Sequence, residues 1–399
     1  MQYGMGTYIR ELTGALLANT NINLYVINYH NRDQSEFTID HISPSYCKIN
    51  IPSPKVPSLR HNQFDEKYAT AVINLLSEVI PESGKVVFQM NYIDDFTIFR
   101  KLKEKYSYPV ISIVHFAQWQ QLFNGNKGRL NGLNINNPSN NIEFTLCREK
   151  AMYLSSDHIV SVTRYMKDFL ISEYGIDSEK IDVIPNGIDF SRFHTISQEE
   201  KISHKHNSGF RQEEKIILFS GRIDHCKGIF LLIDAFCKAC NKVDDLRLVI
   251  VGLGDITACL KRYSSFYGRI TFTGFIPLDQ MKNFYQIADI GVVTSVYDHC
   301  PYTVLEMMAY NVPMIVSRIN GLDEILDDEQ CFFIDPVFKE SGEITFDIDQ
   351  LADAIINLTR DNLLRNKLAF NSYKKLTEKF TASRMAEEMR SLFFNMTEN

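Results

Sequence analysis

Two carboxylates, Asp298 and Glu306, lie eight residues apart on either side of Pro301. Just before them, residues 290–294 form a short apolar, β-branched run that predicts a buried parallel strand. Pro301 falls at the expected first turn of a helix, where a missing N–H group costs nothing. A helix that begins at the carboxyl end of a parallel strand offers unpaired N–H groups to a phosphate or a sugar hydroxyl. We therefore expect an anion site, with Glu306 accepting both hydroxyls of a ribose and Asp298 within reach of the sugar.

A second loop carries an arginine and a lysine between a strand and a helix. Residues 215–220 predict the strand and residues 229–240 the amphipathic helix, with Gly221, Arg222 and Lys227 between them. An arginine can chelate two phosphate oxygens, and a lysine acts as a mobile point charge. A solvated basic turn explains most such pairs taken alone. The acid pair downstream makes a diphosphate site the better interpretation.

The order of these motifs resembles the C-terminal half of retaining glycosyltransferases of family 4, the glycosyl transferases group 1. In sequence order the motifs are Gly-Arg-x4-Lys-Gly from 221, Val-Gly-Leu-Gly from 251, Phe-Thr-Gly-Phe from 272, the acid pair, and Asn-Gly-Leu-Asp-Glu from 320. Upstream, Pro-Asn-Gly-Ile-Asp from 185 resembles the interdomain signature of that family, and Gly4 and Gly6 resemble its N-terminal glycine loop. The match covers nearly the whole chain.

Apolar strand patterns alternate with helical patterns from end to end, which predicts an α/β protein with doubly wound parallel sheets. The resemblance implies the GT-B fold, two Rossmann-like domains facing a cleft. The expected strands are 24–29, 86–90, 110–115, 158–162, 216–219, 246–251, 270–273, 290–294 and 313–316. The expected domains are an acceptor-binding domain at 1–188, a polar linker at 189–211, a nucleotide-sugar domain at 212–380, and a C-terminal helix at 381–399 that packs back on the first domain.

The resemblance implies transfer of a hexose from a nucleotide diphosphate sugar to an acceptor hydroxyl with retention of the anomeric configuration. No protein nucleophile is evident, and the family suggests a same-face route in which the phosphate oxygen takes the acceptor proton. Positive groups placed where leaving-group charge develops are the strongest catalytic lever. The expected catalytic residues are Arg222, Lys227, Asp298 and His115. The expected donor-binding residues are Gly4, Gly6, Gly221, Gly274, Phe275, Cys300, Pro301, Tyr302, Thr303 and Glu306.

Two of these assignments carry an alternative reading. His115, at the end of an expected strand, matches a family histidine that would hydrogen-bond the donor sugar, and a satisfied structural histidine is the alternative. Asp298 stands where the family more often has glutamate, so its shorter side chain either shifts donor preference or is tolerated. Intact Arg222, Lys227 and Glu306 favour activity over a catalytically silent nucleotide-sugar-binding subunit, which remains the alternative function.

The composition of the 399 residues excludes several classes of protein. A hydrophobic content of 45% fits a globular chain of two domains, and a net charge of −7 argues against a nucleic-acid partner. Eight scattered cysteines, without disulfide-type spacing, and the lack of a long apolar stretch predict a cytoplasmic protein. Some relatives touch the inner face of a membrane. The best candidate for peripheral contact is the basic stretch at 100–105, for which a solvated helix face is the favoured reading.

Competing enzyme classes fit poorly. A metal-dependent transferase needs Asp-x-Asp at a strand end, and the candidate at 347–349 reads better as a helix N-cap, so we expect no metal site and no cofactor beyond a UDP- or GDP-linked substrate. A nicotinamide oxidoreductase would need G-x-G-x-x-G at 252–257, where the third glycine is Thr257. A hydrolysing nucleotide-sugar epimerase lacks both motif pairs. The acceptor stays open among a saccharide, a lipid-linked sugar and a peptide.

Two regions, the N-terminus and residues 122–141, do not follow the regular alternation of strands and helices. In the family a strand precedes the glycine loop, whereas this sequence opens on that loop, so we expect either an N-terminal sheet one strand short or a start set about ten residues too late. Residues 122–141 are rich in asparagine and glycine, which predicts a long mobile loop, too polar to pack, on the acceptor side.

Overall fold

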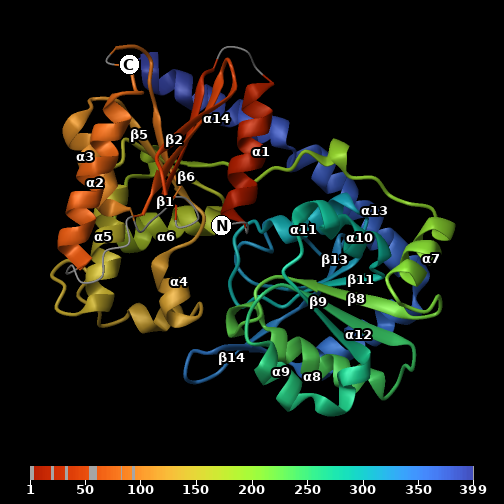
Figure 1. Ribbon diagram of the computed structural model, residues 1–399. Helices are drawn as coiled ribbons and strands as arrows, with labels where there is room; N and C mark the ends of the chain where they lie inside the picture. Colours follow the sequence, from red (N-terminus) through yellow and green to blue (C-terminus); the bar gives the residue numbers. More distant parts are fainter. Residues whose placement is uncertain are drawn as a thin grey trace.

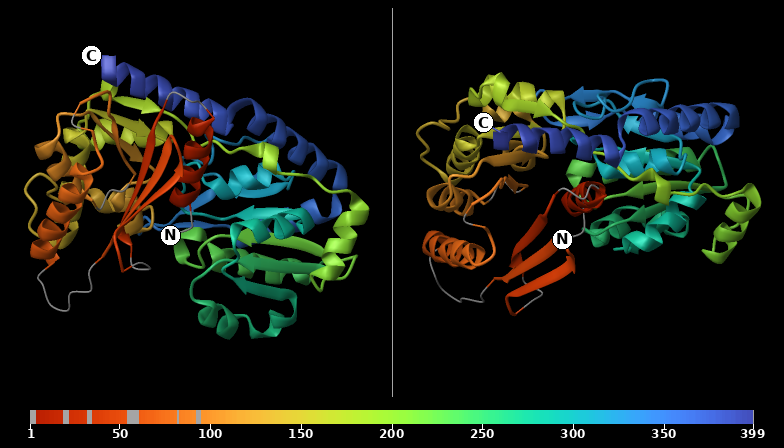
Figure 2. Two further views of the ribbon diagram at one scale, coloured as in Figure 1. Left: turned by 45° about the horizontal axis from the view of Figure 1, so that its top comes forward. Right: turned by 90° about the horizontal axis from the view of Figure 1, so that it is seen from above.

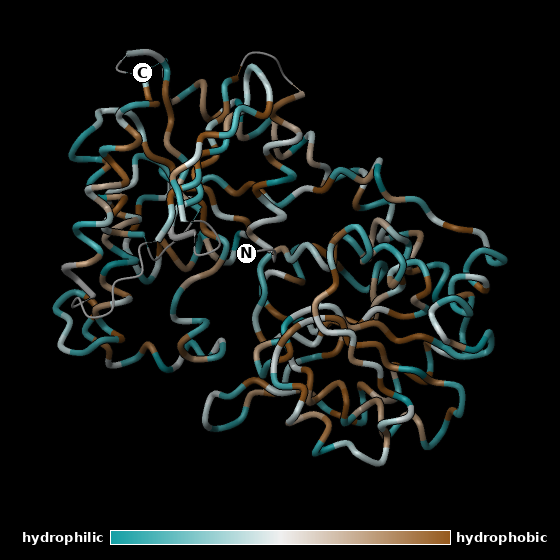
Figure 3. The backbone as a smooth tube through the Cα atoms, in the orientation of Figure 1, coloured by the Kyte–Doolittle hydropathy of each residue, from teal (hydrophilic) through white to brown (hydrophobic). Residues whose placement is uncertain are grey.

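The computed structural model describes residues 4–18, 22–31, 35–53, 61–81, 83–91 and 95–398. Two α/β domains lie side by side, and the first residues of helix α1 lie between them (Figure 1). The strands at the centre of the C-terminal domain are strongly hydrophobic, whereas the outer loops are hydrophilic (Figure 3). This pattern is the one expected of parallel sheets that are covered by helices on both faces.

The C-terminal domain is built on a six-stranded parallel sheet in the order β10-β9-β8-β11-β12-β13. Its strands are β8 (Lys215–Ser220), β9 (Leu246–Val251), β10 (Ile270–Gly274), β11 (Ile290–Val293), β12 (Met314–Ser317) and β13 (Cys331–Ile334). The connecting helices are α8 (Ile229–Cys240), α9 (Ile256–Arg262), α10 (Leu278–Ile287), α11 (Tyr302–Ala309) and α12 (Ile348–Arg360), with short 3-10 turns η4 (His225–Lys227) and η5 (Ser264–Arg269). This strand order is the doubly wound order of dinucleotide-binding folds. The predicted fold is thereby confirmed for this half.

The N-terminal domain departs from the prediction of one doubly wound parallel sheet. Its strands form a four-stranded parallel sheet in the order β4-β5-β6-β7 and a separate sheet in the order β1-β3-β2, in which β2 is antiparallel to β3. The strands are β1 (Leu24–Asn31), β2 (Thr38–Ser43), β3 (Tyr46–Pro52), β4 (Phe88–Met90), β5 (Val110–Val114), β6 (His158–Ser161) and β7 (Ile181–Val183). Within the described residues, the first element is α1 (Met5–Leu17) and no strand precedes it. The strand β2 was not predicted, because it is almost wholly exposed and lacks an apolar face. The strand β3 was not predicted either, although it is largely buried.

The remaining elements cover the sheets and join the domains. In the N-terminal domain these are α2 (His61–Ser77), α3 (Phe96–Lys105), α4 (Gln118–Phe123), η1 (Lys127–Leu130), α5 (Asn141–Ser155), α6 (Arg164–Tyr174) and η2 (Ser178–Lys180). The joining segment holds η3 (Phe190–Arg192) and α7 (Gln198–Asn207), and the C-terminal part adds the hairpin β14 (Pro336–Phe338) and β15 (Ile344–Phe346), α13 (Asn362–Lys379) and α14 (Ala382–Glu398). In the predicted linker, Lys201 and Lys205 both pair with Asp289 of the C-terminal domain, at 2.9 and 2.7 Å.

The chain crosses between the domains twice, at adjacent points. Ile188 and Thr381 form a parallel bridge, with the Ile188 N–H donating to the Phe380 carbonyl at 2.9 Å. After this second crossing, α14 runs over the N-terminal domain and lies against α1 (Figure 2). Met385, Met389 and Leu392 of α14 belong to the same buried cluster as the apolar side chains of α1.

The segment predicted to be a structureless polar loop is ordered, so that prediction is wrong. Residues 122–141 contain η1, and Leu130, Leu133 and Ile135 pack on the core of the N-terminal domain. The Glu143 carboxylate accepts the backbone N–H groups of Asn134 and Ser139 at 3.0 and 2.8 Å, which lowers the pKa of Glu143 to about 2. The Glu143 carboxylate thus accepts backbone N–H groups of this segment, and these hydrogen bonds help to order it.

The basic stretch at 100–105 lies in α3, where three of its cations pair with carboxylates. Arg100 and Lys101 pair with Glu66 at 2.6 and 3.2 Å, and Lys103 pairs with Asp157 at 2.6 Å. These partners neutralise most of the stretch. None of the helices in the described part of the chain combines the length and the apolar character that crossing a lipid bilayer needs.

Candidate functional site

The residues expected to bind the donor diphosphate meet at the carboxyl end of the C-terminal sheet. Strands β8 and β11 are neighbours there, at the point where the strand order reverses. Ligands of open α/β sheets bind in the crevice at such a switch point. The loop after β8 carries Gly221, Arg222 and Lys227, and the loop after β11 carries Asp298. The Lys227 Nζ atom lies 2.5 Å from the Asp298 Oδ2 atom, so the two loops are joined by an ion pair.

The loop after β8 is shaped by caps and close backbone contacts. The Asp224 carboxylate caps η4 by accepting the Lys227 N–H at 3.0 Å, and it also pairs with Arg222 at 3.2 Å. The Arg222 side chain is 47% exposed. Gly228 adopts a φ of +64°, and a Cβ there would lie 2.0 Å from the Thr294 carbonyl oxygen. A larger residue would therefore separate the two loops at the site.

The loop after β11 contains a strained residue, Cys300, whose backbone is held by a hydrogen bond from Asn186. Cys300 has a φ of +48°, a conformation that non-glycine residues rarely adopt. Its carbonyl oxygen accepts the Asn186 side-chain amide at 2.7 Å. Pro301 follows as the N-cap residue of α11, and no side chain caps this helix. Asn186 belongs to the Pro-Asn-Gly motif, so this motif holds the loop that presents the α11 N-terminus.

Glu306 lies in the middle of α11 and is buried. The Tyr285 hydroxyl donates to its Oε2 atom at 2.6 Å. Burial raises the pKa of Glu306 to about 7, against the opposing effects of the Tyr285 hydrogen bond and of Arg10. Its electrostatic neighbours Arg10 and Glu11 belong to α1, which brings the N-terminal domain to this helix. In the same helix, the Thr303 hydroxyl faces the Ser220 carbonyl oxygen of β8 at 3.5 Å.

The N-terminal domain contributes two of the predicted groups, α1 and His115. Gly4 is the N-cap residue of α1 with a φ of +23°, and Gly6 lies inside the helix. The predicted glycine loop is therefore a helix start, whose first N–H groups lack intrahelical partners. The His115 ring packs edge-on against the Tyr8 ring, with centroids 4.6 Å apart. Burial lowers the pKa of His115 to about 4, so its imidazole is neutral near pH 7.

Gly274 ends β10, which lies two strands from β8 and the switch point, and Phe275 follows it. The Gly252 N–H donates to the Gly274 carbonyl at 2.9 Å, and Gly274 has a φ of +69°. A Cβ on Gly252 would lie 1.8 Å from the Gly221 carbonyl oxygen, so the turns after β8, β9 and β10 pack together at one edge. No contact joins Gly274 to the Lys227 and Asp298 pair within the described residues, and its predicted role toward the base stays a prediction.

The sequence did not identify two residues that connect this site to the N-terminal domain. His299 follows Asp298, is buried, and lies between Gln120 and Thr163 of the N-terminal domain. Glu324 belongs to a motif that was recognised without a role, and its carboxylate binds backbone N–H groups at the start of α6. The only signal in the sequence was that His299 directly follows Asp298, a predicted site acid. Its partners, 136 and 179 residues away, could not be read from the sequence.

The Asp-x-Asp at 347–349, which a metal-dependent transferase would use, lies at the start of α12. Among the residues that the structure describes, no group of three or more histidine, cysteine, aspartate or glutamate side chains could hold a metal ion. The Asp347 carboxylate accepts the N–H groups of Asp349 and Gln350 at 2.8 and 3.3 Å, as an N-cap of α12. This agrees with the N-cap reading of that Asp-x-Asp.

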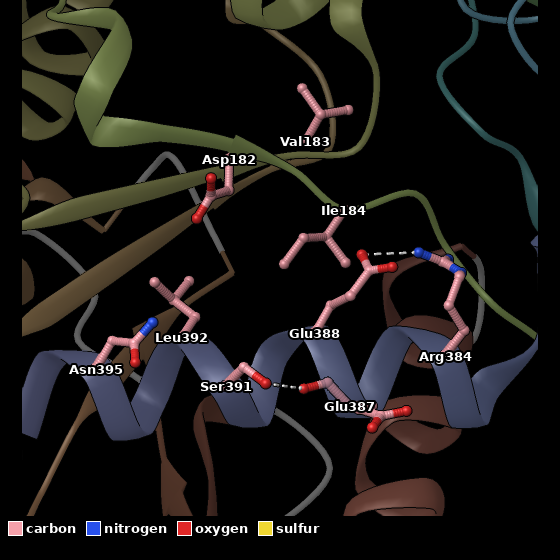
Figure 4. A pocket seen from close by; sticks show the side chains of 9 residues that line it. All are labelled: Asp182, Val183, Ile184, Arg384, Glu387, Glu388, Ser391, Leu392 and Asn395. Carbon is pink, nitrogen blue, oxygen red and sulfur yellow. Dashed lines mark hydrogen bonds and ion pairs between the residues drawn. The ribbon is translucent and has the colours of Figure 1, made fainter.

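A separate pocket of about 400 Å³ lies between β7 and α14, away from these loops (Figure 4). Among its charged side chains, Asp182 pairs with His158, outside the pocket, at 3.0 Å. Arg384 pairs with Glu388 at 3.0 Å, and the Ser391 hydroxyl donates to the Glu387 carbonyl at 3.0 Å. None of the predicted site residues lines it.

The chain matches descriptions of known families along nearly its whole length. Residues 3–192 match Glycosyltransferase Family 4, and residues 200–375 match Glycosyl transferases group 1. An uncharacterised glycosyltransferase of Methanocaldococcus jannaschii is 31% identical over 60% of this chain and 61% of its own length. The chain thus spans about three fifths of that relative.

Solved structures of low identity share the fold. Sucrose-phosphate synthase from Thermosynechococcus elongatus superposes with a TM-score of 0.77 over 98% of this chain and 93% of that one, at 19% identity. HepE of Anabaena, in complex with UDP-glucose, superposes with a TM-score of 0.67 over 86% of each chain, at 14% identity. With the two family matches and this fold, the chain belongs to the family 4 glycosyltransferases with a group 1 domain, of GT-B fold.

Proposed function

We propose that this protein transfers a hexose from a UDP- or GDP-linked sugar to an acceptor hydroxyl and retains the anomeric configuration. The observation that carries the proposal is the pair formed by Lys227 and Asp298 at the sheet's switch point, with Arg222 exposed on the same loop as Lys227. An ammonium and a guanidinium on one strand-to-helix loop suit a diphosphate.

Departure of the leaving group is the step these cations would assist. The bond between the anomeric carbon and the phosphate oxygen breaks, and its electron pair goes to the diphosphate. Arg222, Lys227 and the uncapped N-terminus of α11 lie where that charge would develop. The acceptor oxygen bonds to the same face of the anomeric carbon, and its proton passes to the departing phosphate oxygen. We infer that no metal ion takes part.

Buried polar atoms without partners support a polar ligand in this cleft. Among the described residues, the buried polar atoms without a hydrogen-bond partner include His115 Nε2, Asn186 Oδ1 and the Tyr302 hydroxyl; others, such as the Tyr106 hydroxyl and Trp119 Nε1, belong to other parts of the N-terminal domain. Such a group costs free energy on the order of 1–3 kcal/mol. Hydroxyls of a bound sugar would satisfy them, with His115 on the hexose and Glu306 on the ribose.

The family resemblance suggests the wider role. We infer that the donor is a nucleotide sugar because HepE, a structural neighbour, was solved with UDP-glucose. We place the protein in the cytoplasm, acting on a saccharide, lipid-linked or peptide acceptor in the synthesis of a cell-surface polysaccharide or glycoconjugate, with peripheral contact at the inner face of the membrane.

A panel of UDP-, GDP- and ADP-sugars, with EDTA present, tests the proposal by thermal shift and by nucleotide release. Selective stabilisation together with release from one donor is the expected result. Stabilisation without release, with candidate acceptors present, would identify a silent nucleotide-sugar-binding subunit instead. No stabilisation by any of the donors would contradict both.

A further inference from the structure

We propose that His299 and Glu324 are positioning residues that hold the two domains closed by binding the same helix end, the first turn of α6. This inference rests on the proposed function, because it assigns these residues to the closed, transferring state of the same site. Both belong to the C-terminal domain, on the loops after β11 and β12, and α6 belongs to the N-terminal domain.

His299 fills the interface directly behind the donor loop. It is 6% exposed, and its Nε2 atom lies 2.7 Å from the Gln120 Nε2 atom and 3.0 Å from the Gln120 Oε1 atom. Its Nδ1 atom lies 3.4 Å from the hydroxyl of Thr163, the N-cap residue of α6. The Thr163 hydroxyl also accepts the Met166 N–H at 3.3 Å, so one hydroxyl joins His299 to the first turn of α6. Every polar atom of the imidazole is therefore used across the domain boundary.

Aromatic packing adds a third contact to the same helix turn. The His299 ring stacks on the Tyr165 ring, with centroids 5.7 Å apart and an interplanar angle of 13°. Burial lowers the pKa of His299 to about 4. The stacked imidazole is thus neutral in the closed arrangement, as its hydrogen bonds require.

Glu324 binds the next two residues of α6. Its Oε2 atom accepts the Arg164 N–H at 2.7 Å and its Oε1 atom accepts the Tyr165 N–H at 2.9 Å. These N–H groups belong to the first turn, which has no intrahelical partners and carries the positive end of the helix dipole. A carboxylate from the other domain thus acts as a capping group. Opening of the cleft would return these N–H groups to water and release the carboxylate.

Gly321 joins the two loops into one unit. It has a φ of +97°, and a Cβ there would lie 2.4 Å from the Asp298 carbonyl oxygen and 2.7 Å from His299 Nδ1. The loop that holds Glu324 therefore packs directly on the residues that follow the Lys227 partner. Closure of the domains and placement of Asp298 are coupled through this contact, and closure would exclude water from the donor.

The test compares Glu324→Gln with Glu329→Gln, and Glu324→Asp serves as the conservative variant. Glu324 and Glu329 are both exposed, so neither change should prevent folding. The measurements are kcat and KM for transfer, the ratio of donor hydrolysis to transfer, the affinity for UDP and for GDP by calorimetry, and the radius of gyration by X-ray scattering. His299→Phe, which keeps the stacking ring and removes both hydrogen bonds, is the second variant.

For Glu324→Gln we expect kcat to fall about five- to tenfold, as for loss of one charge-assisted hydrogen bond, with a raised hydrolysis ratio and a larger radius of gyration. Nucleotide affinity should change less than about twofold. Glu324→Asp should lie between this variant and the wild type. If both Glu324 variants match Glu329→Gln in every readout, the inference is wrong. If the wild type transfers no sugar, the proposed function fails, while the scattering comparison still decides whether Glu324 closes the domains.

Discussion

Lys227 and Asp298 form an ion pair of 2.5 Å across the two loops that flank the switch point of the C-terminal sheet. Their side chains are 24% and 15% exposed, so the pair is largely shielded from water. The cation expected to stabilise the leaving group is thus held in place by the acid expected to bind the sugar. A bound diphosphate would share this cation, which places the reacting bond next to Asp298.

Substitution of Arg222 should remove turnover without unfolding the protein. Arg222 is half exposed and its side chain pairs with Asp224 at 3.2 Å, so Arg222→Ala should change the free energy of unfolding by less than about 0.5 kcal/mol. Nucleotide release should fall at least about a hundredfold, as for removal of one preorganised group that stabilises transition-state charge. Arg262→Ala is the matched control, because Arg262 is 55% exposed and pairs with Asp234. A rate equal to that of the control would remove the leaving-group assignment.

Asp298→Asn should slow transfer by about tenfold or more, because the amide cannot neutralise Lys227 or hold its ammonium in place. Asp349→Asn provides the comparison. It breaks an exposed pair with Lys238 of similar length, 2.7 Å, and should affect neither rate nor stability measurably. Steady-state kinetics of sugar transfer by both variants test this prediction. Equal rates in the two variants would mean that Asp298 has no part in the reaction.

Glu306 predicts a particular dependence of stability on pH. Its pKa is about 7 in the folded chain and near 4.5 when unfolded, so between these values the folded state keeps a proton that the unfolded state has lost. Stability from this residue is present below pH 4.5, falls as the pH rises, and levels off above 7. Glu306→Gln should remove this loss, so the variant should gain about 2–3 kcal/mol relative to the wild type between pH 5 and 8. Chemical denaturation of the wild type and of Glu306→Gln at pH 5 and at pH 8 measures this gain. The same difference in stability between the two proteins at both pH values would contradict a raised pKa of Glu306.

Gly321→Ala should both destabilise the protein and disturb the donor loop. Gly209→Ala is the control for backbone strain alone, because Gly209 has a similar φ of +81° and a Cβ there would meet open space. The control should cost about 1 kcal/mol, whereas Gly321→Ala should cost clearly more because its Cβ collides with the backbone at Asp298. Chemical denaturation measures the free energy of unfolding of both variants. An equal loss of stability in the two variants would mean that the loops carrying Gly321 and Asp298 can move apart without an energetic cost.

The strands and helices of the C-terminal half could be predicted because their signals lie within short stretches of the sequence. Buried parallel strands appear as continuous apolar runs, and the helix after β11 begins at Tyr302, directly after Pro301. The positions of Arg222, Lys227 and Asp298 follow from these elements. Their roles in transfer stay predictions. The strands β7 and β13 were not predicted, although strands as short, such as β4 and β12, were.

The remaining features depend on contacts between distant parts of the chain. Residues 122–141 looked unstructured because their composition is polar, and Glu143, which binds their N–H groups, lies outside the segment. The contact of His299 with Gln120 exists only because the two domains meet. The split of the N-terminal strands into two sheets is likewise a matter of pairing, which apolar runs do not encode.

The most direct test of the central claim measures nucleotide release from UDP- and GDP-sugars, in EDTA, by the wild type, by Lys227→Ala and by Lys238→Ala. Lys238 pairs with Asp349 at 2.7 Å on the surface of the same domain. We predict release by the wild type and by Lys238→Ala at similar rates, and a loss of at least about a hundredfold in Lys227→Ala. Release that persists in Lys227→Ala would contradict the assignment of this site to the departing diphosphate.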